Sequence, residues 1–112
     1  MHSFTAIEFL GDSLEVLRRF PEVARRRAGY QLDRVQHGLE PDDWKPMNSI
    51  GAGVREIRIR EERGAFRVVY VTKFAGTAYV LHCFQKKSQR TSSRDLEIAT
   101  KRYKELQKEH RS

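Results

Sequence analysis

The spacing of apolar residues predicts a short strand and two helices in the first third of the chain. Residues 4–9 carry a short, weakly patterned run of apolar side chains, which we interpret as a strand. Asp12 with Glu15 three positions later has the spacing of a helix capping box, so a short helix is expected to follow. Pro21 separates it from a longer helix over 22–37, and the pair predicts a helical hairpin. The core-facing positions of the longer helix are Ala24, Ala28, Leu32 and Val35.

The hydrophobic period changes from 3.6 to 2 in the middle of the chain. A stretch rich in Pro, Gly and Asp at 39–53 predicts a loop. Strands are then expected at 54–60, 66–73 and 77–84, joined by two short turns that contain glycine. Three strands joined in this way predict an antiparallel meander. Apolar residues on both faces of the last two strands indicate that both faces of the sheet are covered.

The last part of the chain predicts a basic loop and an amphipathic helix. The loop covers 85–91, and Ser92 with Asp95 three positions later is a second capping-box signature. The following apolar positions recur at helical spacing. We therefore expect one α+β domain over residues 1–112, with a short N-terminal strand, a helical hairpin, an antiparallel sheet of three to four strands and a C-terminal helix. The apolar positions of the last helix are Leu96, Ala99, Tyr103 and Leu106.

Composition limits the class of protein. With 112 residues the chain has room for one core, and 33% of its residues are charged, with a mean hydropathy of −0.71. No apolar run is long enough for a membrane helix, and the N-terminus lacks the basic and apolar regions of a signal peptide, so we expect a cytoplasmic protein. The single cysteine, Cys83, excludes an intramolecular disulfide and a multi-cysteine metal site, and we interpret it as a small core residue.

The net charge of +7 is unevenly distributed. Residues 1–44 carry six basic and eight acidic side chains, residues 45–83 carry seven and three, and residues 84–112 carry nine and four. A basic excess confined to two thirds of the chain favours a polyanionic partner, which could be a nucleic acid, an acidic protein or an anionic membrane surface. The alternative is a solvated basic surface that serves solubility.

One group of basic residues is placed to converge on a single sheet face. Arg58 and Arg60 share a face of the first meander strand, Arg67 lies on the next strand, and Lys86 and Lys87 follow the last strand. Such a cluster could bind phosphates and stabilise a phosphorane-like transition state, and a lysine crowded by cations could have a lowered pKa and move protons. The alternative is an exposed strand face with ordinary solvated charges.

For each of three further residues, two interpretations are open. Glu56 could be a general base, or an ion-pair partner of Arg58 on its own strand. His82 lies inside an apolar strand, where a histidine is more often a core group than a catalyst. Phe84 could stack on a base or close the core. The histidines have no metal-ligand spacing and no glycine-rich phosphate loop is present, so neither a metal nor another cofactor is expected.

Several segments together resemble a known family. They are V-R-E-I-R-I-R at 54–60, G-A-F-R-V-V-Y-V at 64–71, the block F-Q-K-K-S-Q-R-T at 84–91, and E-I-A-T-K-R at 97–102. Over essentially the whole chain, the sequence resembles the phage-derived toxin-like family of the RelE/HigB superfamily of type II toxin–antitoxin toxins.

The resemblance implies a RelE-like, microbial RNase-like fold and an mRNA interferase activity. Toxins of this family enter the ribosomal A site and inhibit translation by cutting mRNA, with the 2′-hydroxyl as nucleophile and a 2′,3′-cyclic phosphate as product, without a metal. The implied partners are the ribosome with its mRNA and a cognate antitoxin of the helix-turn-helix type, in a toxin–antitoxin hetero-oligomer. By position, the implied catalytic residues are Arg58, Arg67, Lys86 and Lys87, and the implied RNA-binding residues are Arg60, Phe84, Gln89 and Arg90.

The sequence departs from the RelE pattern at two positions. The tyrosine that some members carry in the last helix falls at Leu96, with Tyr103 two turns further on, and a lysine of the first meander strand falls at Glu56. The acid–base assignment is therefore open, with Glu56 and His82 as candidates. The alternative function is a catalytically weak toxin-fold protein that binds nucleic acid or an antitoxin.

Overall fold

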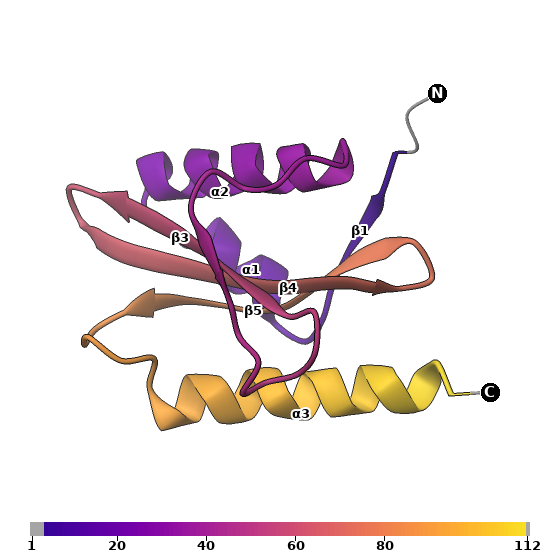
Figure 1. The fold of residues 1–112 in the computed structure, drawn as a ribbon. Helices are drawn as coiled ribbons and strands as arrows, with labels where there is room; N and C mark the ends of the chain where they lie inside the picture. Colours follow the sequence, from indigo (N-terminus) through magenta and orange to yellow (C-terminus); the bar gives the residue numbers. More distant parts are fainter. Residues whose placement is uncertain (1–3, 112) are drawn as a thin grey trace.

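The chain folds into three layers, with a β-sheet between helices α1 and α2 on one face and helix α3 on the other (Figure 1). The computed structural model describes residues 4–111, and no helix within them is both long and apolar enough to cross a membrane. This α+β architecture confirms the predicted fold class. The elements are β1 (Ala6–Phe9), α1 (Ser13–Arg18), α2 (Glu22–Gln36), β2 (Trp44–Pro46), β3 (Arg55–Glu61), β4 (Gly64–Phe74), β5 (Thr77–Lys86) and α3 (Ser93–Glu109).

The sheet has five strands in the order β1-β5-β4-β3-β2. Strands β3, β4 and β5 form the predicted antiparallel meander. At the β4–β5 turn, Ala75 and Gly76 have φ angles of 51° and 65°, and positive values at both central residues are what a type I′ hairpin turn requires. β1 pairs parallel to β5, with Ala6 opposite Thr77, so the expectation of a wholly antiparallel sheet was wrong. With four residues, β1 is too short for its apolar pattern to indicate the direction of its partner.

The predicted loop at 39–53 contains the short strand β2, which the sequence pattern did not reveal. Trp44 lies opposite Ile57 and Pro46 opposite Arg55, so β2 extends the sheet beside β3. The Arg55 guanidinium also lies over the Trp44 ring, 4.0 Å from its centroid. Three residues that end in proline are too few to show a period of two, and their strand conformation depends on the backbone of β3.

Only one of the two predicted capping boxes forms. The Ser92 hydroxyl accepts the Asp95 backbone N–H at 3.1 Å at the start of α3, as predicted. Asp12 stands at the N-cap of α1 but makes no side-chain cap hydrogen bond. Its carboxylate accepts a hydrogen bond from Arg102 Nη2 at 2.9 Å instead, which ties α1 to α3 and lowers the pKa of Asp12. Gly11 permits this contact because its φ is 55° and a Cβ there would collide with the Arg102 guanidinium.

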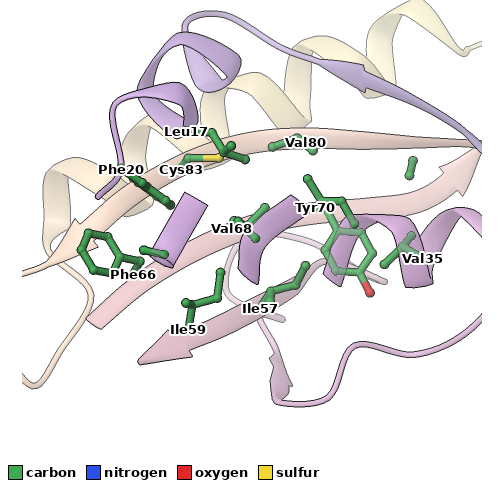
Figure 2. Close-up of a cluster of buried hydrophobic side chains, with 14 residues drawn as sticks. Leu17, Phe20, Val35, Ile57, Ile59, Phe66, Val68, Tyr70, Val80 and Cys83 are labelled. Carbon is green, nitrogen blue, oxygen red and sulfur yellow. The ribbon is translucent and has the colours of Figure 1, made fainter. Parts of the chain in front are cut away.

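The first core lies between the sheet and the helical hairpin (Figure 2). Helix α2 turns its predicted apolar side towards the sheet, and the two alanines on that side are fully buried, which lets the helix approach the strands closely. The burial of these side chains supplies the main driving force for docking the hairpin. The sheet and α1–α2 contribute Leu17, Phe20, Leu32, Val35, Ile57, Ile59, Phe66, Val68, Tyr70, Val80 and Cys83, among others.

The second core lies between the opposite face of the sheet and α3. A register shift in β5 places Val80 opposite Tyr70 but His82 opposite Val69, so Leu81 is an extra, bulged residue. The bulge resets the alternation, and His82 and Phe84 then share the α3 side of the sheet with Leu81. The core combines Val54, Val69, Val71, Tyr79, Leu81, Phe84, Ala99, Tyr103 and Leu106 with Met47 and Ile50.

Candidate nucleic-acid interface

The predicted basic residues converge on the α3 side of the sheet. Arg58 lies directly opposite Arg67 in the β3–β4 pair, and residues opposite each other in antiparallel strands project on the same face. Lys86 is the last residue of β5 and does not follow the strand as the sequence suggested, because the backbone pairing of β5 with β4 continues to Ala65. The side chains enclose an open hollow of about 610 Å³, lined by Arg58, Arg60, Ala65, Arg67, Lys86, Lys87, Ser88 and Gln89.

The hollow owes its space to a small residue between long ones. Ala65 lies opposite Arg60 on one side and opposite Lys86 on the other, so a single methyl group separates two long cationic side chains. A larger side chain at position 65 would occupy the floor of the hollow. Lys87, Ser88 and Gln89 complete the lining from the loop between β5 and α3, which lies at the same end of the sheet as the β3–β4 hairpin (Figure 1).

Arg67 is the most deeply placed cation of the hollow. Its side chain is 2% exposed; Nη1 donates to the Phe66 carbonyl at 3.0 Å, and Nε lies 3.4 Å from Glu56 Oε1. Burial lowers the pKa of the Arg67 guanidinium, and the Glu56 carboxylate acts in the opposite direction. An arginine stays protonated at neutral pH even so. The hollow therefore contains a fixed positive charge that is poorly hydrated.

The other cations are more accessible. Burial lowers the pKa of the Lys86 ammonium, and the neighbouring Arg67 charge lowers it further. Arg58 Nε lies 3.9 Å from Asp43 Oδ1, while Arg60 and Lys87 are exposed. A lysine whose pKa is lowered gives up its proton more readily than an ordinary surface lysine. The site thus combines three guanidinium groups that keep their charge with two ammonium groups, of which that of Lys86 has a lowered pKa.

Glu56 does not line the hollow. The side chain is completely buried beneath it, and Lys45 Nζ approaches Oε1 to 3.9 Å while the Thr91 hydroxyl donates to Oε2 at 3.2 Å. The carboxylate therefore pairs across the sheet with Arg67 and Lys45, and the expected pairing along its own strand with Arg58 is not what forms. Sequence reasoning missed Thr91, although it is the last residue of the F-Q-K-K-S-Q-R-T block.

His82 and Phe84 lie behind the hollow and not in it. His82 Nε2 lies 2.7 Å from Asp95 Oδ1, and the imidazole stacks on the Phe84 ring with centroids 5.3 Å apart. Phe84 is 7% exposed and belongs to the second core, so of its two interpretations the structure favours closing the core. Tyr103 is also a core residue, with its hydroxyl donating to the Ala52 carbonyl at 3.2 Å.

The lining of the hollow selects for anions. Five of its eight side chains are cationic and none is acidic. Of the two remaining residues predicted to contact RNA, Gln89 lines the hollow, whereas Arg90 is exposed on the same loop outside it. Within residues 4–111, no three or more His, Cys, Asp or Glu side chains gather as potential metal ligands. The arrangement is suited to phosphate groups, which arginines bind through bidentate hydrogen bonds and lysines bind as point charges.

A comparison with protein families places the chain in a family. The family model for phage derived protein Gp49-like (DUF891) matches residues 15–104, a range that contains every residue of the hollow. No curated protein matches the chain. The chain therefore belongs to the Gp49-like family of phage-derived proteins, a toxin-like family.

Proposed function

We propose that the protein is the toxin of a toxin–antitoxin pair and that it cleaves mRNA on the ribosome, in the cytoplasm. The observation that carries this proposal is the convergence of five cations from β3, β4, β5 and the following loop on one hollow without an acidic lining residue. Membership of a toxin-like family supports it independently. The RelE/HigB resemblance of the sequence supplies the reaction type.

The proposed reaction is a transesterification within the RNA. The 2′-oxygen of one nucleotide attacks the adjacent phosphorus, and the bond from phosphorus to the 5′-oxygen breaks, which leaves a 2′,3′-cyclic phosphate. The 2′-hydroxyl loses one proton and the departing 5′-oxygen gains one, so the reaction needs no other reactant. Negative charge accumulates on the non-bridging phosphate oxygens in the transition state, and cations placed beside them lower the barrier.

The geometry divides the roles among the lining residues. Arg67 is buried and held by Glu56, so it offers a preorganised charge to the phosphorane. Arg58 lies opposite it and can contact the same phosphate, while Arg60 and Lys87 at the rim are placed to hold neighbouring phosphates. Lys86 has the lowered pKa expected of a residue that delivers a proton to the leaving oxygen.

The partners follow from the same surface. We expect the toxin to bind ribosomes that carry mRNA, and a cognate antitoxin, of the helix-turn-helix type that the resemblance implies, to block it in a hetero-oligomer. Because contacts to phosphates position a nucleic acid but carry no sequence information directly, a basic hollow of this kind can position RNA without reading its sequence.

The test is induced expression in a bacterial host, followed by primer extension on a reporter mRNA. Wild type should arrest growth and produce cuts in phase with codons, and Arg58→Met should abolish both. Lys101→Met, on the exposed side of α3, is the matched control and should behave as wild type. Growth arrest with intact mRNA would refute the nuclease, and undiminished cleavage by Arg58→Met would refute the site.

A second function is favoured by one specific observation. Both acid–base candidates from the sequence, Glu56 and His82, are buried and engaged with other side chains. A hollow with cations but without a free carboxylate or imidazole could bind RNA without cutting it. If the protein binds RNA and no cleavage products appear on translating ribosomes, the function of a binding module is supported.

A further inference from the structure

Thr91 connects the loop after β5 to the interior of the sheet. Its hydroxyl donates to Glu56 Oε2 at 3.2 Å, although Glu56 lies 35 residues earlier, on β3. β3 and β5 are separated by β4, so the contact joins the chain after β5 to a strand that β5 does not pair with. It is made on the side that carries the basic hollow.

The same carboxylate holds two other segments. Glu56 Oε1 lies 3.4 Å from Arg67 Nε on β4 and 3.9 Å from Lys45 Nζ on β2. A fully buried carboxylate is costly unless hydrogen bonds and opposite charges compensate it, so the three partners and Glu56 depend on one another. One side chain therefore links β2, β4 and the loop.

The segment 87–90 is held at both of its ends. On one side it continues from the last paired residue of β5, and on the other Thr91 binds Glu56 and Ser92 caps α3. Between these anchors the side chains are exposed, and one local hydrogen bond joins Ser88 Oγ to the Arg90 carbonyl at 2.7 Å. Because Lys87, Ser88 and Gln89 form one wall of the hollow, the position of that wall depends on the Thr91 anchor.

We propose that the Thr91–Glu56 hydrogen bond is a latch that sets the wall of the RNA-binding hollow. Glu56 is then a positioning residue that orients Arg67 and the loop together, and not a general base. Thr91 is a positioning residue as well. The effect on cleavage rests on the proposed function, whereas the effect on the loop does not.

The first experiment measures the mobility of the loop itself, by nitrogen-15 relaxation of the backbone amides in the full chain. Thr91→Val keeps the shape of the side chain and removes only its donor, and Thr91→Ser keeps the donor. Because the Thr91 anchor holds the wall, backbone order parameters at 87–91 should fall below about 0.6 in Thr91→Val and stay near wild type in Thr91→Ser. Amides in the centre of β4 serve as the internal reference.

The matched control removes a threonine hydroxyl at the opposite end of the sheet. Thr77→Val deletes a donor to the Ala75 carbonyl, in the β4–β5 hairpin, and should leave the order parameters at 87–91 unchanged. Equal order parameters at 87–91 in wild type and Thr91→Val would overturn the latch. Lower order parameters throughout the chain, β4 included, would also overturn it, because they would indicate a general loss of order.

The second experiment measures cleavage in single turnover on ribosomes loaded with mRNA. Thr91→Val should lower the maximal rate by about tenfold, while the toxin concentration that gives half the maximal rate changes by less than about threefold, because the phosphate charges that determine binding remain. Thr91→Ser should restore the rate. A change in binding alone would overturn the positioning role. If wild type does not cleave, the proposed function fails, and the order parameters at 87–91 still decide whether the latch exists.

Discussion

The buried pair of Glu56 and Arg67 allows stability and activity to be separated. Arg67 Nε and Glu56 Oε1 are 3.4 Å apart, and both side chains are almost or entirely buried. At this distance and an effective dielectric constant of about 20, their attraction is about 5 kcal/mol, against which the loss of hydration of both groups must be set. The pair therefore adds little net stability when complete, but removing one member leaves a buried charge.

The single changes should each destabilise the protein by about 3 kcal/mol, the lower end of the range for broken buried pairs. Arg67→Met leaves the Glu56 carboxylate with Lys45 at 3.9 Å and the Thr91 hydroxyl, which limits the loss. Glu56→Gln leaves the Arg67 charge among other cations of the hollow. The double variant contains neither buried charge, so we expect its loss to be about 2 kcal/mol or more below the sum of the two single losses.

Urea unfolding followed by fluorescence measures this coupling. Trp44 is the only tryptophan and lies in β2, beside β3, so its emission reports on the part of the sheet that carries Glu56. The double variant should remain folded yet fail to cleave mRNA, because it lacks both the Arg67 charge and the Glu56 carboxylate that positions the wall of the hollow, and its loss of activity is then not a loss of folding. If the two single losses add within about 0.5 kcal/mol, the inferred coupling between Glu56 and Arg67 is refuted.

Three further predictions follow from the structure. Lys86→Met should reduce the slope of log affinity against log salt for single-stranded RNA by about 0.7, as expected for one lost phosphate contact, and Lys101→Met should not change it. Leu106→Ala should lower the free energy of unfolding by about 3 kcal/mol in urea titrations, because Leu106 is 2% exposed in the second core. The Arg102 hydrogen bond lowers the pKa of Asp12 in the folded protein. The hydrogen bond therefore stabilises the protein fully above the pKa of the unfolded carboxyl group, about 3.9, and this stabilisation is lost as the pH falls through the lower pKa of the folded state. The melting temperature of Asp12→Asn should therefore fall less on acidification than that of wild type. An equal fall in both proteins would contradict the stabilising role of the Asp12–Arg102 hydrogen bond.

Much of the candidate site could be predicted because alternation along a strand is a local property. Arg58 and Arg60 are two residues apart and so share a face, and the turn between β3 and β4 is short enough to bring Arg67 opposite Arg58. The bulge at Leu81 had no comparable signal. It decides that His82 and Phe84 lie on the α3 side, where they pack against one another and against the core.

The sequence by itself determined the order of the main helices and strands, the cap at Ser92 and the gathering of basic residues on one sheet face. These features depend on neighbours within a few positions or on the next strand of a hairpin, so hydrophobic period and turn chemistry suffice to predict them. Only the tertiary structure decided that β1 pairs parallel to β5, that Asp12 binds Arg102, and that Glu56 holds Arg67 and Thr91. Each of these contacts joins groups far apart in the chain. The packing of the layers determines which groups meet, and local hydrophobic periodicity contains no information about that packing.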